Sequence, residues 1–220
     1  MNIKQLWTIT KKELYYEYKE KQNVMFILVF ALLMITTYSF SFTITQDLLK
    51  QITPGFIWIV TIFTGMMCFE RSISYELYND CFTGLLVAPI EKSAIYMGKT
   101  IANFIILFCT NVIVVPLLFI LFDFRYYHHL VLFFVVMIVG LFGFSIVGTF
   151  LACISNKVLF YILLLPMVSP LLIAGAQSTK ILFLTENQIH DMFSWLKMMI
   201  AYDCIFFTVC YWLIDFVLGE

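Results

Sequence analysis

The stretch ERSISYELYNDCFTGLLVAPIEK, residues Glu70–Lys92, separates two long apolar runs. Its first four charged residues, Glu70, Arg71, Glu76 and Asp80, would together cost about 10 kcal/mol in the middle of a bilayer, since each charge there costs roughly 2.5–3.5 kcal/mol. The stretch must therefore lie in water or at a membrane surface. The apolar runs on either side are long enough to cross a bilayer core of about 30 Å. The sequence thus predicts a polar connection between two membrane-spanning helices.

The composition of the whole chain is that of a membrane protein. Of its 220 residues, 62% are hydrophobic and only 12% are charged, about half the charged fraction of a soluble domain. The net charge is -1, and no acidic or basic tail indicates a nucleic-acid partner. None of the six cysteines forms a C-x-x-C pair, so we interpret them as buried thiols.

We expect an all-α membrane protein that forms a single permease domain over residues 1–220. Six spans are predicted: Val24–Thr43, Ile52–Phe69, Ala94–Leu121, Leu130–Ile154, Val158–Gln177 and Met198–Leu218. Residues 24–69 thus hold spans one and two, and residues 94–218 hold spans three to six. The turn at residues 155–157 is so short that spans four and five must be adjacent and antiparallel.

Residues 1–22 predict a helix that lies in the membrane interface. Apolar residues fall on one helical face and five lysines lie among acidic residues, a pattern typical of an amphipathic interfacial helix with an aromatic anchor. The apolar face consists of Ile3, Leu6, Trp7, Leu14 and Tyr18. A solvated helix is the alternative reading.

Residues 70–92 also carry apolar side chains at helical spacings, at Ile73, Leu77, Phe82, Leu85 and Leu86. The pattern suits one or two short surface helices, broken near Gly84 and ended by Pro89. A surface helix between two spans is what an integral membrane protein needs to hold a soluble partner. An ordinary solvated loop is the other interpretation of the same residues.

The positive charges predict the orientation. If both chain termini are cytoplasmic, nine of the 13 Lys and Arg residues lie inside, which satisfies the positive-inside rule. The four that remain outside are Lys50, Arg125, Lys180 and Lys197. Residues 70–92 are then cytoplasmic as well.

Prolines and glycines mark special positions in the spans. Pro54-Gly55 falls at the outer start of span two, where proline suits the first turn of a helix. Pro166 and Pro170 fall inside span five, where each removes a backbone donor and favours a kink. We expect Trp58 to help shape the spans with these four residues.

Span four carries Gly140, Gly143, Gly148 and Ser145, which indicate a close helix contact, either within the chain or with a second copy.

The sequence offers little catalytic chemistry. It contains no G-x-x-x-x-G-K-[ST] phosphate-binding loop, so ATP would have to be bound by a partner. The adjacent His128 and His129 cannot share a helical face, which argues against a chelated metal. Asp203 and Asp215 are the main ionisable residues inside a predicted span. Each lies near a predicted helix end, so a functional carboxylate and one that reaches the membrane surface are both open readings.

Three motifs resemble the haem exporter protein B (CcmB) family of cytochrome c maturation, within the ABC-2-type membrane subunits. They are ITPGFIW at Ile52–Trp58, Glu70-Arg71 together with LLVAP at Leu85–Pro89, and LPMVSPLLI at Leu165–Ile173. Their order and spacing match the family over essentially the whole chain. Asp80 and Thr83 depart from it, since glycine and glutamate are common there.

The resemblance implies a non-catalytic permease subunit in a bacterial inner membrane or an organellar counterpart. A separate soluble ABC ATPase would hydrolyse ATP. The haem-handling membrane protein C and the small protein D of the same system would complete a complex with two copies of this chain. ATP hydrolysis would release a haem-loaded chaperone, with haem as the cargo and no cofactor bound directly. The residues that would face the ATPase are Glu70, Arg71, Glu76, Asp80, Leu85 and Pro89.

Two alternatives stay open at this point. The same fold could move another cargo, such as a lipid, a drug or a polysaccharide. A membrane scaffold that only recruits a cytosolic partner would also account for residues 70–92.

Overall fold

A computed structural model of the chain describes residues 3–19, 21–41, 46–78, 91–122, 129–154, 157–184 and 189–217. Every regular element in these residues is an α-helix. The helices are α1 (Ile3–Lys19), α2 (Lys21–Ser41), α3 (Gln46–Tyr78), α5 (Lys92–Leu121), α6 (Leu130–Ile154), α7 (Lys157–Leu184) and α8 (Ile189–Val217). The all-α fold class predicted from the sequence is confirmed.

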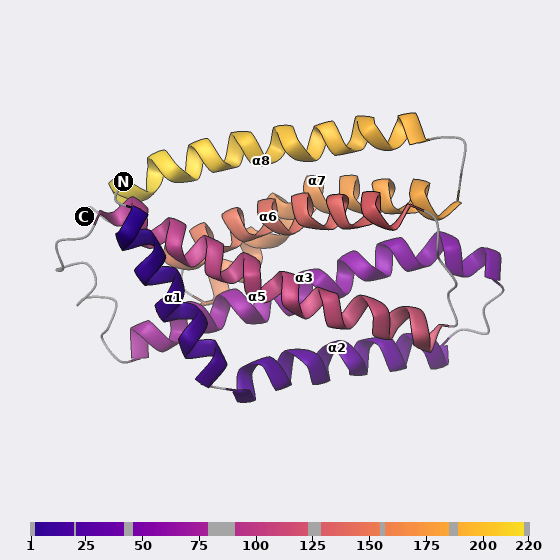
Figure 1. Ribbon diagram of the computed structural model, residues 1–220, viewed down its shortest axis with the longest axis horizontal. Coiled ribbons are helices and arrows are strands. Elements are labelled where there is room, and N and C mark those ends of the chain that lie inside the picture. Colours follow the sequence, from indigo (N-terminus) through magenta and orange to yellow (C-terminus); the bar gives the residue numbers. More distant parts are fainter. Residues whose placement is uncertain are drawn as a thin grey trace.

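The long helices run side by side along the length of the molecule, while α1 lies at a steep angle across one end (Figure 1). The end of α3, the start of α5, the start of α7 and the end of α8 all lie at this same end, on the left of the view. Helices α3, α5, α6 and α7 pack together at the centre, with α2 beside α3 and α5, and α8 beside α6 and α7. Segments far apart in sequence (α1, the start of α7 and the end of α8) therefore lie at the same end of the bundle as the end of α3 and the start of α5.

Five helices in the described part of the chain are long and apolar enough to cross a membrane. They cover Leu48–Glu70, Lys92–Leu121, Leu130–Ile154, Leu159–Leu184 and His190–Ile214. Helix α2 contains a shorter apolar stretch, Met25–Phe40. Large apolar side chains are exposed on many of these helices; Phe40 is 92% exposed and Val131 78%. A surface of this kind suits a hydrocarbon solvent, because water would leave large apolar patches uncovered.

Hydroxyl side chains inside the bundle bond to their own helices. Thr61, Thr64 and Thr100 each donate to the carbonyl four residues earlier, at 2.9 Å. Such local bonds matter in a bilayer, where no water is available to satisfy a polar group. Between helices, the Asn103 side chain donates to Thr149 Oγ1 at 3.0 Å, which ties α5 to α6.

Several predicted boundaries agree with the helices found, and others were wrong. The fourth predicted span and α6 are both Leu130–Ile154. Helix α3, however, continues through Glu70 to Tyr78, so no separate surface helix starts after Phe69. The charged side chains exclude this segment from lipid but not from a helix, and α3 simply extends beyond its apolar part. The rest of the predicted surface helix, residues 79–90, lies outside the described residues.

Two further expectations are corrected by the helix starts. Helix α3 begins at Gln46, so the buried Pro54 lies in its interior and not in its first turn. Helix α8 begins at Ile189, well before the predicted Met198, because the polar residues ahead of Met198 are helical too. Asp203 is consequently equally far from both ends of α8 and not near one of them.

Candidate functional site

Helix α3 continues beyond its apolar stretch, and this last part, residues 70–78, is its charged end. The candidate span within α3 ends at Glu70, and the helix goes on to Tyr78. Arg71 and Glu76 belong to this last part of the helix, and their backbones are described while their side chains are not. Asp80, Leu85 and Pro89, also expected at the partner-facing surface, lie outside the described residues.

Glu70 is held by a side chain from another helix. The Tyr161 hydroxyl, near the start of α7, donates a hydrogen bond to Glu70 Oε2. A hydrogen bond to a carboxylate is about twice as strong as one between neutral groups. The charged end of α3 and the start of α7 are therefore joined at the end of the bundle where α5 also starts.

The start of α5, on the other side of residues 79–90, is anchored to α6. Tyr96 is fully buried, and its hydroxyl donates to the Ile146 carbonyl at 2.9 Å. The ring of Tyr96 also meets Phe150 edge-on. Because Tyr96 links the two helices, a displacement of the start of α5 would also displace α6.

A buried ion pair joins α5 to α1. Lys99 Nζ lies 3.3 Å from Glu13 Oε1, and the Lys99 side chain is fully buried. One turn away along α1, the Thr10 hydroxyl donates to the Gly98 carbonyl at 3.2 Å. A Cβ atom at Gly98 would lie 2.8 Å from Ile9 Cγ2, so the absence of a side chain lets the two helices approach closely.

Sequence reasoning missed this junction. It counted Lys99 only as a positive charge on the cytoplasmic side, although a lysine within an apolar run is itself a signal of a buried partner. Glu13 gave no such signal, because it lies among other charged residues of an amphipathic helix. The face of α1 that packs on α5 is formed by Leu6, Ile9, Thr10 and Glu13. Trp7 and Tyr18, which belong to the face predicted to lie in the membrane interface, are exposed.

Trp58 lies at the centre of the helix bundle. It is 2% exposed, and its indole Nε1–H donates to Thr179 Oγ1 at 3.1 Å. The ring lies between α6 and α7 where both helices carry glycine: a Cβ atom at Gly140 or Gly175 would come within 2.1 or 2.5 Å of it. Gly55, one turn earlier on α3, has open space around its Cβ position.

The glycines of α6 therefore make their close contacts within the chain. Gly140 faces Trp58, Gly143 faces Asp203 and Gly148 faces Phe69. The sequence left open whether these glycines contact another part of the chain or a second copy, and at these three positions the contact is within the chain.

Pro166 and Pro170 both lie inside α7, which runs as one helix through them. Proline at position 170 cannot donate to the carbonyl four residues earlier. The Ser169 hydroxyl donates to that Pro166 carbonyl at 2.8 Å and so replaces the missing bond. On the neighbouring turn, the Tyr202 hydroxyl of α8 donates to the Met167 carbonyl at 2.8 Å.

Asp203 is the carboxylate that lies deepest in the described bundle. It is 7% exposed, and its Oδ1 has no hydrogen-bond partner among the described residues. That oxygen lies directly on Gly143: a Cβ atom there would be 1.9 Å away. Of the two readings left open by the sequence, the structure excludes a side chain that reaches the membrane surface. The side chain of Asp215 is outside the described residues.

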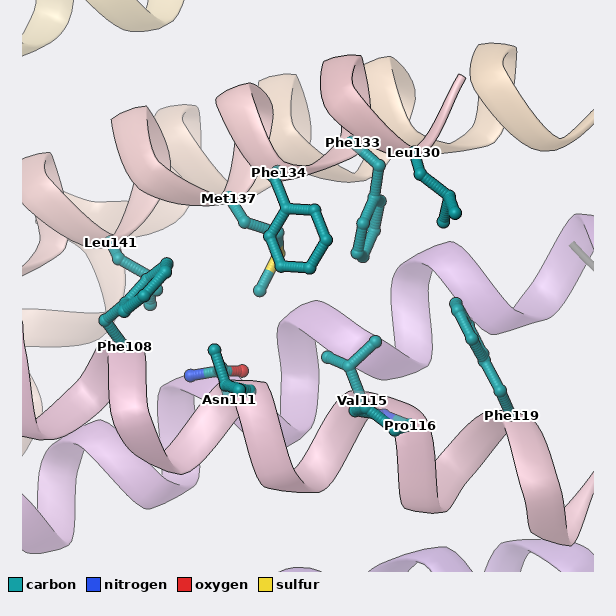
Figure 2. Close-up of a pocket in the computed structure, with 11 residues that line it drawn as sticks. Phe108, Asn111, Val115, Pro116, Phe119, Leu130, Phe133, Phe134, Met137 and Leu141 are labelled. Atoms are coloured by element: carbon teal, nitrogen blue, oxygen red, sulfur yellow. The ribbon is translucent and has the colours of Figure 1, made fainter. Parts of the chain in front are cut away.

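An apolar cavity of about 140 Å³ lies between α5 and α6 (Figure 2). Phe108, Phe119, Phe133 and Phe134 form much of its wall, and Asn111 is its one amide. The Asn111 side chain is already engaged, since its amide nitrogen donates to the Leu107 carbonyl at 3.0 Å. No group of three His, Cys, Asp or Glu residues in the described ranges could hold a metal ion.

Comparisons with a family of sequences and with individual curated proteins point to the same family. The sequence pattern of the family described as "CcmB protein" matches residues 4–215. Two curated relatives, from Escherichia coli strain K12 and from Shigella flexneri, are each named "Heme exporter protein B". Each is 26% identical over 100 residues, which are 46% of this chain and 46% of the relative. The alignment spans about half the length of the curated relatives.

Proposed function

This chain belongs to the CcmB family, and from that membership we propose that it is the membrane permease subunit of an ABC transporter complex that serves haem export and cytochrome c maturation. A separate soluble ATPase subunit hydrolyses ATP, and the present chain is non-catalytic. Haem is the cargo of the complex. The observation that carries this proposal is the family match, which extends over nearly the whole chain.

Residues 70–92 form the surface on which the ATPase acts. Support comes from α3, which carries Glu70, Arg71 and Glu76 beyond the apolar part of the helix. Both helices that flank this surface are tied to others, α3 to α7 through Glu70 and Tyr161, and α5 to α1 through Lys99 and Glu13. Movement of residues 70–92 during the nucleotide cycle would therefore be transmitted to α1 and α7 as well. Such transmission requires that the contacts differ between two states.

The complete membrane part has six spans, with α2 as the first. Among the described residues, five helices are long and apolar enough to span a membrane, and the shorter apolar stretch of α2 carries exposed apolar side chains as they do. With both termini in the cytoplasm, the charged end of α3 faces the ATPase and most positive residues lie inside. The chain works as a homodimer in a bacterial inner membrane, together with the haem-handling membrane protein C and the small protein D.

Complementation tests this proposal. The chain is expressed in bacteria that lack their own family member but retain the other subunits, and covalently bound haem in c-type cytochromes is measured. We expect restored cytochromes and co-purification of the ATPase. The double variant Glu70→Ala with Arg71→Ala should still insert into the membrane but should give little cytochrome c. Lys197→Gln, which removes an exposed charge in the first half of α8, away from the end of α3, is the control.

Two results would overturn the proposal. A host that stays without c-type cytochromes, although the chain is inserted and recovered with an ATPase, would indicate another cargo. Normal cytochrome yield in the Glu70→Ala, Arg71→Ala variant would show that the end of α3 does not transmit ATP hydrolysis.

A further inference from the structure

A groove of about 160 Å³ separates part of α1 from α5. Leu14 and Tyr18 of α1 form one wall, and Ile105, Cys109 and Ile113 of α5 form the other. The volume is comparable to that of cavities in other proteins that hold a benzene molecule, about 150 Å³. Most of the residues that line it are apolar, with Glu17 and Thr110 as the exceptions. The side chains at its mouth are exposed, with Ile113 at 46% and Tyr18 at 75%. The groove therefore opens sideways, along a helix that has the composition of a membrane span.

The face of α1 beside this groove is both basic and aromatic. Trp7, Lys11, Tyr15 and Tyr18 follow one another at helical spacings of three and four residues, and all are exposed. Lys19 is exposed next to Tyr18, at the end of α1. Lysines beside exposed tryptophan and tyrosine are typical of helices at the level of the lipid headgroups. Basic residues in that position attract anionic lipids.

We propose that α1 and α5 together bind one anionic phospholipid. Lys11 and Lys19 bind its phosphate-containing headgroup, and one acyl chain enters the groove and runs along α5 towards Ile113. Trp7 and Tyr18 flank the lipid at the interface between headgroup and hydrocarbon. The occupant is a lipid and not a protein segment, because the groove combines an apolar floor along a span with positive charge at one end.

The walls of this site are fixed before the lipid arrives. The buried pair Glu13–Lys99 and the bond from Thr10 to Gly98 hold α1 against α5 directly beside the groove. A preformed site loses less conformational entropy on binding than one that has to assemble. One acidic residue, the half-buried Glu17, also lines the groove, on the side of α1 that faces α5. The lysines are on the outer side, where the headgroup lies.

Native mass spectrometry of the full chain in a mild detergent tests this proposal. The protein is titrated with phosphatidylglycerol and, separately, with phosphatidylcholine of the same acyl chains, and bound lipid is counted. We expect phosphatidylglycerol to bind more tightly. Lys11→Gln and Lys19→Gln should each weaken its binding about fivefold, as expected for the loss of one headgroup charge contact. Lys197→Gln removes an exposed lysine elsewhere and should leave binding unchanged. Ile113→Trp fills the groove and should weaken binding of both lipids.

A thiol reaction gives a second readout from the parent protein. Cys109 lines the groove, and Cys204 lies on α8; both are exposed, so the interpretation of the cysteines as buried was wrong for these two. Added phosphatidylglycerol should slow the reaction of N-ethylmaleimide with Cys109 and not with Cys204. The proposal is overturned if the two lipids bind equally, if Lys11→Gln and Lys19→Gln behave as Lys197→Gln does, or if Cys109 gains no protection. These measurements read binding only, so they stand whether or not haem is the cargo.

Discussion

Replacing Lys99 by methionine should detach α1 from α5. At 3.3 Å the attraction between Lys99 and Glu13 is about 5 kcal/mol with an effective dielectric constant of about 20. Burial of both groups offsets much of this, but removing one partner leaves the other as an uncompensated buried charge, at a cost of about 3–5 kcal/mol. The half-exposed Lys12, 3.8 Å from Glu13, can compensate in part. We therefore expect a loss of about 3 kcal/mol in the free energy that holds α1 in place.

Hydrogen exchange of the purified protein measures this loss directly. A change of about 3 kcal/mol corresponds to roughly hundredfold faster exchange of the α1 amides, which report local opening. Peptides from α6 should keep their protection, because α6 is packed within the bundle. The matched control combines Glu13→Leu with Lys99→Met, which replaces both charges by apolar side chains. It should exchange within about 1 kcal/mol of the parent, since such exchanges of a buried pair are often neutral or stabilising.

Two results would refute this reasoning. If α1 in the Lys99→Met protein exchanges as slowly as in the parent, the ion pair does not hold the helix. If the effects of Glu13→Leu and Lys99→Met simply add in the double variant, the two residues do not interact energetically.

Three further predictions concern the contacts inside the bundle. Gly143→Ala places a Cβ atom 1.9 Å from Asp203 Oδ1 and should lower the free energy of unfolding by about 1–3 kcal/mol, which a lower thermal unfolding midpoint in detergent would show. Adding Asp203→Ala should recover much of this loss, and an equal loss in the double variant would contradict the contact. Trp58→Phe keeps an aromatic ring but removes the hydrogen bond to Thr179, so the free energy of unfolding should fall by about 1 kcal/mol. Trp58→Ala should lower it by about 3–5 kcal/mol, and equal losses in the two variants would argue against packing of the ring between the glycines. Tyr161→Phe removes the hydroxyl that donates to the charged end of α3, so the complex should still hydrolyse ATP but give a lower yield of cytochrome c. The free energy of unfolding should change by less than about 1.5 kcal/mol. An unchanged yield would exclude a part for this hydrogen bond in coupling.

The sequence predicts the membrane character and most helices of this chain because long apolar runs have few alternatives in a bilayer. Helix α6 is predicted with both boundaries as found, since its run is uninterrupted and is followed by the polar Ser155-Asn156-Lys157. Helices that leave the membrane are predicted less well. The charges at Glu70 and Arg71 mark where lipid ends, and nothing in them marks where the α3 helix ends.

The contacts between helices could be predicted only in part. The glycines of α6 indicate a close approach, but the sequence does not say that Trp58, on a different helix, fills the space against Gly140. Lys99 and Glu13 are separated by 86 positions, and a single sequence contains no signal that pairs them. The depth of Asp203 was misjudged for a simpler reason. Because the first residues of α8 are polar, its predicted start came too late in the chain.

The proposed function requires that the end of α3 lies in the cytoplasm and is the part of the chain on which the ATPase acts. Glu76→Cys in a background without native cysteines tests it most directly, because residue 76 belongs to the last turns of α3. A membrane-impermeant maleimide should leave this cysteine unlabelled in intact cells and label it after the inner membrane is opened, and co-expressed ATPase should protect it. Labelling from outside in intact cells, or equal labelling with and without the ATPase, would contradict the account.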